Sequence, residues 1–285
     1  MREHTALSMY WKKKWDKILE SYPISTVNQP LNKQIELWSN IANTCGVPLG
    51  MNSERITEVM DIIKTLGLID SDSTVLDIGC GTGAYAIPLS EIAKEVDALD
   101  FSAAMLEILQ GQISERGISN IRLLEQDFVC FASDAKTKEK RYQLVFSSLN
   151  PGLYNSDSIL EMTKLCCGSC IFISSKEANT RSEQCLDPII LEAESSIIKG
   201  GNVIYPFNML YHMGYNPQIY YTTYYSDREE SAEVAAKRLI KCYQDKVRCR
   251  PGFEQIISKY VEDNTTDGVF IEKTFGTLGV LIWAV

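Results

Sequence analysis

Apolar residues follow two periodicities along the chain. Short apolar runs with the spacing of strands occupy residues 75–78, 95–100, 120–125, 142–149 and 169–175. Around them lie segments with an apolar residue every three or four positions, as in amphipathic helices: residues 8–22, 31–42, 54–66, 84–93, 103–116 and 157–167. Strands that alternate with helices predict a parallel sheet covered by helices, here preceded by a helical N-terminal extension.

The last third of the chain has a different pattern. Helical spacing recurs over residues 188–198, 206–213, 229–247 and 251–261. A tyrosine-rich strand is predicted over residues 218–225, and further strands over residues 269–275 and 280–284. Gly276 lies between the last two segments, so we expect them to form a closing antiparallel hairpin.

A glycine-rich turn follows the first predicted strand. Asp77 lies inside the strand end, and Gly79, Gly81 and Gly83 follow at alternate positions. A strand, a glycine turn and a helix together lay backbone N–H groups against a ligand. The spacing Gly79-x-Gly81-x-x-Ala84 also satisfies the dinucleotide-binding fingerprint. The acid in the strand, the third alternate glycine and the long helical segment before the strand favour a different ligand.

The run V-L-D-I-G-C-G-T-G at residues 75–83 resembles motif I of the class I S-adenosylmethionine (SAM)-dependent methyltransferases. The resemblance covers residues 73–175. It implies a doubly wound, Rossmann-like α/β fold with a mostly parallel seven-stranded sheet and helices on both faces. It also implies that Gly79 and Gly81 let the backbone approach the cofactor, S-adenosyl-L-methionine, and that Asp77 lies near the methionine ammonium.

Later segments resemble the other cofactor-binding loops of the family. Asp100 ends the second strand, where a carboxylate accepts hydrogen bonds from a ribose diol; its alternative role is the N-cap of the next helix. Asp127 and Phe128 stand where the family holds the adenine ring. The residues that we expect at the cofactor are Asp77, Gly79, Cys80, Gly81, Gly83, Asp100, Phe101, Met105, Gln126, Asp127, Phe128 and Ser147.

The resemblance also suggests a division of the chain. We expect a helical cover or lid over residues 1–52 and the methyltransferase domain over residues 53–285, with a variable acceptor region at 200–250. Tyr10, Trp11 and Trp15 form an aromatic stripe in this cover. Such stripes are usually packed on a core, and the alternative here is contact with the methyl acceptor.

Further acceptor-site candidates lie later in the chain. Asn150 and Tyr154 follow the fourth strand, at the sheet edge where such folds place acceptor-facing residues. His212 is a candidate general base, with a structural, hydrogen-bonded histidine as its alternative. Asn150 is the second catalytic candidate.

Composition narrows the range of partners. The net charge is −9 and no basic block is present, which argues against DNA and RNA as main partners.

The nine cysteines at irregular spacing suit a reducing, cytoplasmic location. Cys166, Cys167 and Cys170 provide a single C-x-x-C in a chain with two histidines, so we expect no metal. Neither a signal peptide nor an apolar run of membrane-spanning length is expected.

The expected reaction is transfer of the SAM methyl group to a small-molecule acceptor by in-line displacement. In such a reaction the protein mainly supplies alignment and exclusion of water. A protein or RNA methyltransferase and a SAM-binding protein without transferase activity are the alternatives. Neither the acceptor atom nor the oligomeric state is encoded in a recognisable motif.

Overall fold

The computed structural model describes residues 5–20, 32–36, 38–39, 53–134, 141–150, 153, 155–191, 203–244 and 251–285. The chain divides into two compact units. The first unit comprises Met1–Lys176, Gly200–Thr222 and Leu278–Val285, and the second comprises Glu177–Lys199 and Thr223–Thr277.

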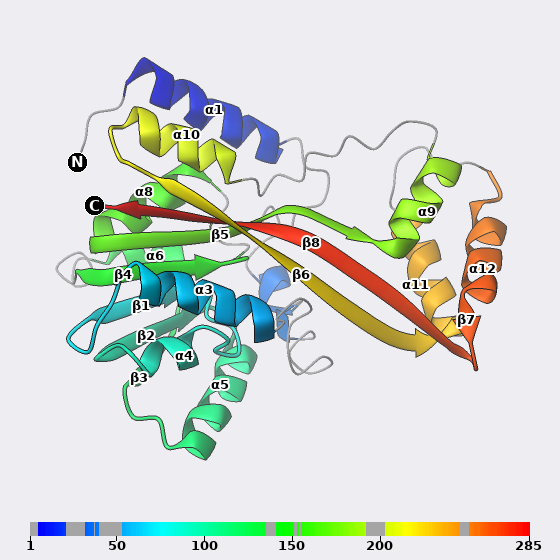
Figure 1. Ribbon diagram of the computed structural model, residues 1–285, viewed down its shortest axis with the longest axis horizontal. Helices are drawn as coiled ribbons and strands as arrows, with labels where there is room; N and C mark the ends of the chain where they lie inside the picture. Colours follow the sequence, from blue (N-terminus) through cyan, green and yellow to red (C-terminus); the bar gives the residue numbers. More distant parts are fainter. Residues whose placement is uncertain are drawn as a thin grey trace. The chain divides into compact units, whose positions relative to one another are not determined.

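The strands form one sheet with the order β3-β2-β1-β4-β5-β8-β6, and β7 pairs with β8 off this path (Figure 1). Their bounds are β1 Thr74–Ile78, β2 Glu95–Asp100, β3 Ile121–Glu125, β4 Tyr142–Ser148, β5 Cys166–Thr180, β6 Gln218–Ser231, β7 Thr265–Thr266 and β8 Val269–Ala284. The pairs β1–β2, β1–β4, β2–β3 and β4–β5 are parallel. The sheet is therefore mostly parallel, as predicted, and the observed order begins with the doubly wound pattern.

Strand β1 lies at the point where the strand order reverses. Asp77 pairs in register with Ala98 of β2 and with Phe146 of β4. Because these strands are parallel, their carboxyl ends meet at the same edge of the sheet, where α/β folds bind ligands. The loops after β1, β2 and β4 therefore converge at one site.

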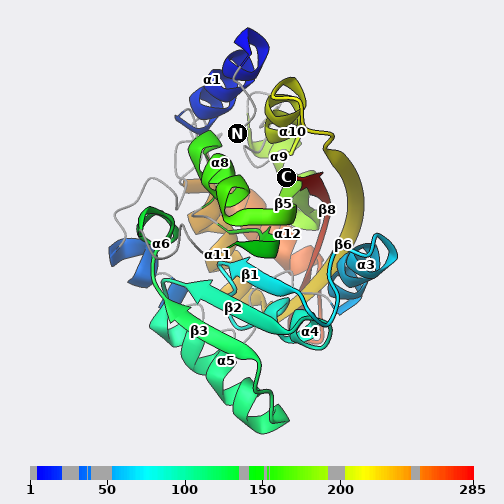
Figure 2. The same ribbon diagram turned by 90° about the vertical axis from the view of Figure 1, so that its left-hand side faces the viewer.

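Helices of the first unit cover both faces of its sheet. They are α1 Ala6–Glu20, α3 Ser53–Thr65, α4 Ala86–Ser90, α5 Ala103–Arg116, α6 Phe128–Ser133, α8 Ser156–Leu165 and α10 Ile204–His212. Helices α3, α4 and α5 lie on one side of the sheet, and α6 and α8 lie on the other (Figure 2). Helix α1 packs against α10 and α8.

The second unit has its own small core. It contains α9 Arg181–Ile190, α11 Ala232–Gln244 and α12 Phe253–Asp263, together with β7. Apolar side chains of the three helices pack with Phe270 of β8. Glu272, only 3% exposed, accepts a hydrogen bond from the Ser182 N–H at 3.1 Å and pairs with Arg238 at 3.2 Å. This buried carboxylate thereby ties α9 and α11 to β8.

Several predicted elements differ from the structure, and β5 and β6 extend beyond their predicted bounds. The predicted hairpin across Gly276 is wrong, because β8 runs without a break from Val269 to Ala284 and Gly276 keeps extended backbone. The predicted helix over 84–93 is shorter, since a turn extends through Tyr85 before α4 begins. Helix α9 begins earlier than the predicted residue 188, because Thr180 and Glu183 form a capping box that fixes its start. Among the described residues, no helix is both long and apolar enough to cross a membrane.

Candidate functional site

The glycine turn after β1 is held against the end of β2. Gly79, Gly81 and Gly83 have φ angles of +71°, +54° and +90°, a region that other residues adopt with strain. The N–H groups of Gly79 and Cys80 both donate to the Leu99 carbonyl, at 2.7 and 3.0 Å. The turn therefore keeps one fixed path at the carboxyl edge of the sheet.

Residues at the end of β4 support the same turn from the other side. The Asn150 amide and the Ser147 hydroxyl both donate to the Ile78 carbonyl, at 3.1 and 2.9 Å. A Cβ atom on Gly79 would lie 2.5 Å from Cγ of Asn150, so only glycine fits at this contact. We expected Ser147 at the cofactor and Asn150 at the acceptor; the structure places both side chains directly under the turn.

Asp100 connects the glycine turn to the loop after β2. Its Oδ2 accepts from the Gly81 N–H at 2.9 Å, and its Oδ1 accepts from the Ser102 N–H at 2.8 Å. Burial raises the pKa of Asp100, while these main-chain hydrogen bonds oppose the rise. The N-cap of α5 is Ser102, whose hydroxyl accepts from the Met105 N–H, so Asp100 is not that cap. A carboxylate has about four acceptor positions, so Asp100 can still accept a hydrogen bond from a ligand hydroxyl.

Asp77 is the buried acid of the site. It is 2% exposed, and its Oδ2 has no hydrogen-bond partner among the described residues. Burial, and to a smaller extent the negative charge of Asp100, raises the pKa of Asp77 to about 8. A buried oxygen without a donor is costly, so this position is suited to a ligand that brings a donor or a positive charge.

The loop after β3 joins the same cluster of loops. The Gln126 N–H donates to the Asp100 carbonyl at 3.0 Å. Asp127 caps α6, since its Oδ1 accepts from the Val129 and Cys130 N–H groups at 2.9 and 3.2 Å. Phe128 is buried beside it. Three of the predicted cofactor segments are thus hydrogen-bonded together, although they are separated along the chain.

The predicted acceptor residues are more dispersed. Trp15 is 1% exposed and its ring lies 6.4 Å from that of Phe172, so it belongs to the core of the first unit. Trp11 is half-buried beside Tyr205, and Tyr10 is exposed. His212 ends α10, where its carbonyl accepts from the Thr5 hydroxyl. Tyr154 lies outside the described residues.

The remaining predicted positions differ in how far they are buried. Cys80 and Met105 are buried and Phe101 is half-buried. Cys166 and Cys170 are buried and Cys167 is exposed. Within the described ranges, no group of three or more histidine, cysteine or acidic side chains is placed to hold a metal.

Arg55 and Tyr85 were not among the predicted site residues. Arg55 of α3 is 1% exposed, and its Nε and Nη1 atoms have no hydrogen-bond partner among the described residues. The buried Tyr85 hydroxyl, just after the glycine turn, also has none there. A single arginine on an amphipathic helix usually indicates a solvated face, so the sequence carries no signal for its burial.

Comparison with known proteins identifies similarity to methyltransferases. Residues 75–167 match the family described as "Methyltransferase domain". The chain is 24% identical over 127 residues to a tRNA/tmRNA (uracil-C(5))-methyltransferase of Pseudoalteromonas atlantica, covering 44% of this chain and 33% of that protein. An uncharacterized protein of Haemophilus influenzae is 37% identical over 67 residues, covering 24% of this chain and 22% of that protein.

Among solved structures, a putative methyltransferase of Bacillus halodurans has a TM-score of 0.47 at 15% identity, covering 81% of this chain and 99% of that one. The chain covers about a third or less of the length of each of the two curated relatives named above. The family match confirms the predicted resemblance to SAM-dependent methyltransferases and the predicted cofactor class.

Proposed function

We propose that this chain, whose residues 75–167 belong to the methyltransferase-domain family, transfers a methyl group from SAM to a small-molecule acceptor. The observation that carries the proposal is the hydrogen bond from the Gly81 N–H to Asp100. Near it lies Oδ2 of Asp77, which no described residue pairs with. The division into a cover at residues 1–52 and a methyltransferase domain at 53–285 remains a prediction.

The residues present fit SAM on three counts. Asp100 has lone pairs available for a ribose diol, and Asp77 has a buried oxygen for the methionine ammonium. Among the described residues, no atom lies within 4 Å of the place where a Cβ of Gly81 would stand, so the backbone there is open to close approach by a ligand. When bound, SAM supplies a methyl group that its sulfonium already activates. The chain's own residues then have to orient the two substrates and exclude water.

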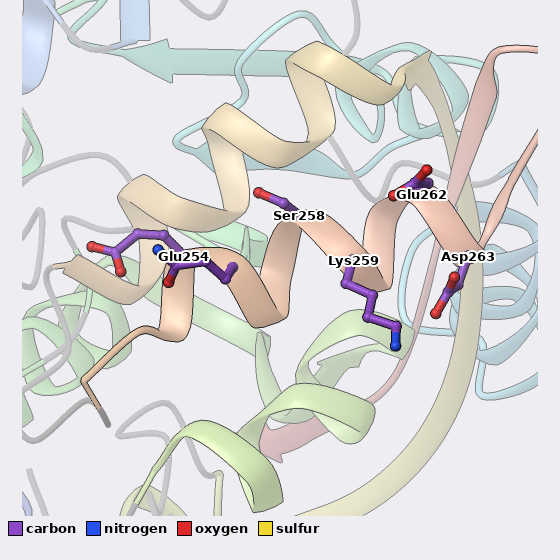
Figure 3. A pocket seen from close by; sticks show the side chains of 6 residues that line it. Glu254, Ser258, Lys259, Glu262 and Asp263 are labelled. Carbon is purple, nitrogen blue, oxygen red and sulfur yellow. The ribbon is translucent and has the colours of Figure 1, made fainter.

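The charge of the chain supports a small acceptor rather than RNA. A groove between α6 and α8 has an apolar side with Phe128 and Val129 and a polar side with Asp157 and Glu161. A second, shallow groove on α12 is lined by Glu254, Lys259, Glu262 and Asp263 among others (Figure 3). Acidic residues outnumber the single lysine at the groove on α12, and the net charge of −9 disfavours phosphate binding overall.

Titration calorimetry tests the cofactor. We expect SAM and its product S-adenosylhomocysteine (SAH) to bind and NAD not to bind. Transfer of a labelled methyl group is then measured with a metabolite extract, with total RNA and with a ribosomal protein fraction. Label in low-molecular-weight products supports the proposal; label only in RNA or protein would replace the small acceptor by a macromolecular one. Binding of NAD without any response to SAM or SAH contradicts the proposed function.

Binding of the cofactor should release a proton from Asp77. The pKa of Asp77 is about 8 in the ligand-free protein, so the side chain is largely protonated at pH 7. An ammonium placed against Oδ2 lowers this pKa, and the affinity for SAH should therefore rise several-fold between pH 6 and pH 8. Calorimetry at pH 7 in buffers of different ionisation enthalpy measures the proton directly.

The Asp77→Asn variant provides the control. It should bind SAH about tenfold more weakly and should lose the proton release, since the amide does not titrate. Its ligand-free stability should depend less on pH than that of the wild-type protein. Because folding raises the pKa of Asp77 from 3.8 to about 8, wild-type stability falls as the pH rises from about 4 to about 8, and the amide avoids this loss. Equal proton release by both proteins would exclude Asp77 as its source.

A further inference from the structure

The guanidinium of Arg55 is a buried charge, and no acidic side chain of the described residues forms an ion pair with it. The side chain is 1% exposed, and Nε and Nη1 are both buried without a hydrogen-bond partner among the described residues. Burial of an unpaired charge is far more costly than an ordinary packing defect. A side chain kept in this state is suited to an anion that arrives from outside the chain.

The surroundings of Arg55 place this charge at the site already described. Arg55 and Ser148, the last residue of β4, lie beside the Tyr85 hydroxyl. Burial raises the pKa of Tyr85, and the positive charge of Arg55 partly offsets the rise. The Tyr85 ring packs on Phe146 with their centroids 4.7 Å apart. Since Phe146 pairs with Asp77 across β1 and β4, Arg55 and Asp77 lie near the same strand ends.

The unpaired atoms are complementary in charge. Nε and Nη1 of Arg55 and the Tyr85 hydroxyl are donors, whereas Oδ2 of Asp77 is an acceptor. Nε and Nη1 can each donate a hydrogen bond to an anionic oxygen such as that of a carboxylate, and the Tyr85 hydroxyl can donate a further one. Close positive and negative groups of this kind suit a ligand that carries a carboxylate, alone or next to an ammonium.

We propose that Arg55 and Tyr85 form a carboxylate-binding subsite of the methyl-transfer site. This inference rests on the proposed function. The carboxylate belongs either to the amino-acid end of the cofactor or to an acidic acceptor. In both cases Arg55 and Tyr85 position the ligand, and the buried charge becomes paired only in the complex.

The first experiment compares two ligands on Arg55→Gln, Arg55→Lys and wild-type protein. SAH carries the amino-acid end, and 5′-methylthioadenosine lacks it. If the cofactor supplies the carboxylate, Arg55→Gln should lower SAH affinity about 10- to 100-fold by calorimetry and leave 5′-methylthioadenosine within twofold. Arg55→Lys keeps the charge but not the planar guanidinium, so its SAH affinity should lie between those of the wild-type protein and Arg55→Gln. Arg116→Gln, at the exposed end of α5, is the matched control and should bind both ligands normally.

The second experiment tests an acidic acceptor. Protein saturated with SAH is titrated with benzoate and with its neutral counterpart benzamide, and the melting temperature is recorded. If the acceptor supplies the carboxylate, benzoate should stabilise wild-type and Arg116→Gln protein, benzamide should not, and Arg55→Gln should lose the benzoate effect. SAH affinity would then be unchanged by Arg55→Gln.

Ligand-free stability separates this role from a structural one. Arg55→Met should melt at the wild-type temperature or above it, because an unpaired buried charge is replaced by an apolar side chain of similar length. A clear loss of stability in Arg55→Met, with unchanged SAH binding in Arg55→Gln and no benzoate effect, would mean that Arg55 only supports the fold, and the inference would be wrong. The inference is also wrong if Arg55→Gln binds SAH normally and keeps the wild-type response to benzoate, while Arg55→Met has wild-type stability. Failure of wild-type protein to bind SAH overturns the proposed function itself, and with it this inference.

Discussion

Replacement of Gly79 by alanine is expected to destabilise the protein by about 2–4 kcal/mol and to abolish measurable SAH binding. Two costs add at this position. The backbone has a φ of +71°, which costs an L-residue roughly 1–2 kcal/mol. The new methyl group would lie 2.5 Å from Cγ of Asn150 and would displace that side chain from the Ile78 carbonyl. Chemical denaturation followed by calorimetry with SAH measures both effects.

Gly117 offers a matched control for the backbone term. It ends α5 with a φ of +66°, and no atom of the residues that the structure describes lies within 4 Å of the place where its Cβ would stand. Gly117→Ala should therefore cost only about 1–2 kcal/mol and leave SAH binding intact. Asn150→Ala combined with Gly79→Ala should recover part of the stability lost in Gly79→Ala, since the contact is removed. If Gly79→Ala and Gly117→Ala lose the same amount of stability, the close contact with Asn150 does not add to the destabilisation.

Replacement of Asp100 by alanine is expected to lower SAH affinity by about 2–4 kcal/mol, roughly 30- to 1000-fold. The carboxylate has two functions in the proposed site. It holds the Gly81 and Ser102 N–H groups, at 2.9 and 2.8 Å, and so fixes both loops in the ligand-free protein. It also has the lone pairs that would accept the ribose hydroxyls. The variant loses the charged acceptor and the order of the turn at once, which calorimetry with SAH measures.

Asp70 provides the comparison for Asp100. Its carboxylate accepts from the Asp72 N–H and the Ser73 hydroxyl in the turn before β1, and it is not part of the glycine-turn cluster. Asp70→Ala should therefore alter stability slightly and SAH affinity by less than about twofold. If Asp100→Ala binds SAH as tightly as Asp70→Ala does, Asp100 is not a ribose ligand and acts only within the loop.

The parts of the fold that depend on short segments were predictable. The apolar runs place β1 to β4 correctly, because a buried strand needs consecutive apolar residues. The glycine turn and Asp100 were also identified, since each depends on a few adjacent residues that suit a turn at a strand end. Parallel pairing then brings Asp77, Asp100 and the turn together, as the alternation of strands and helices predicts.

The sequence by itself therefore determined the positions of the first four strands, the glycine turn and the acids beside it, because each is encoded by residues close together in the chain. Only the tertiary structure decided that Asn150 fills the space beside Gly79 and that Trp15 is a core residue. It also decided that Arg55 is buried next to Tyr85, with two guanidinium nitrogens that no described residue pairs with. These contacts join elements that are distant in sequence, and helical periodicity alone does not tell which polar side chain faces inward. The unbroken course of β8 past Gly276 has the same origin, since pairing with neighbouring strands fixes an extended backbone that glycine alone leaves free.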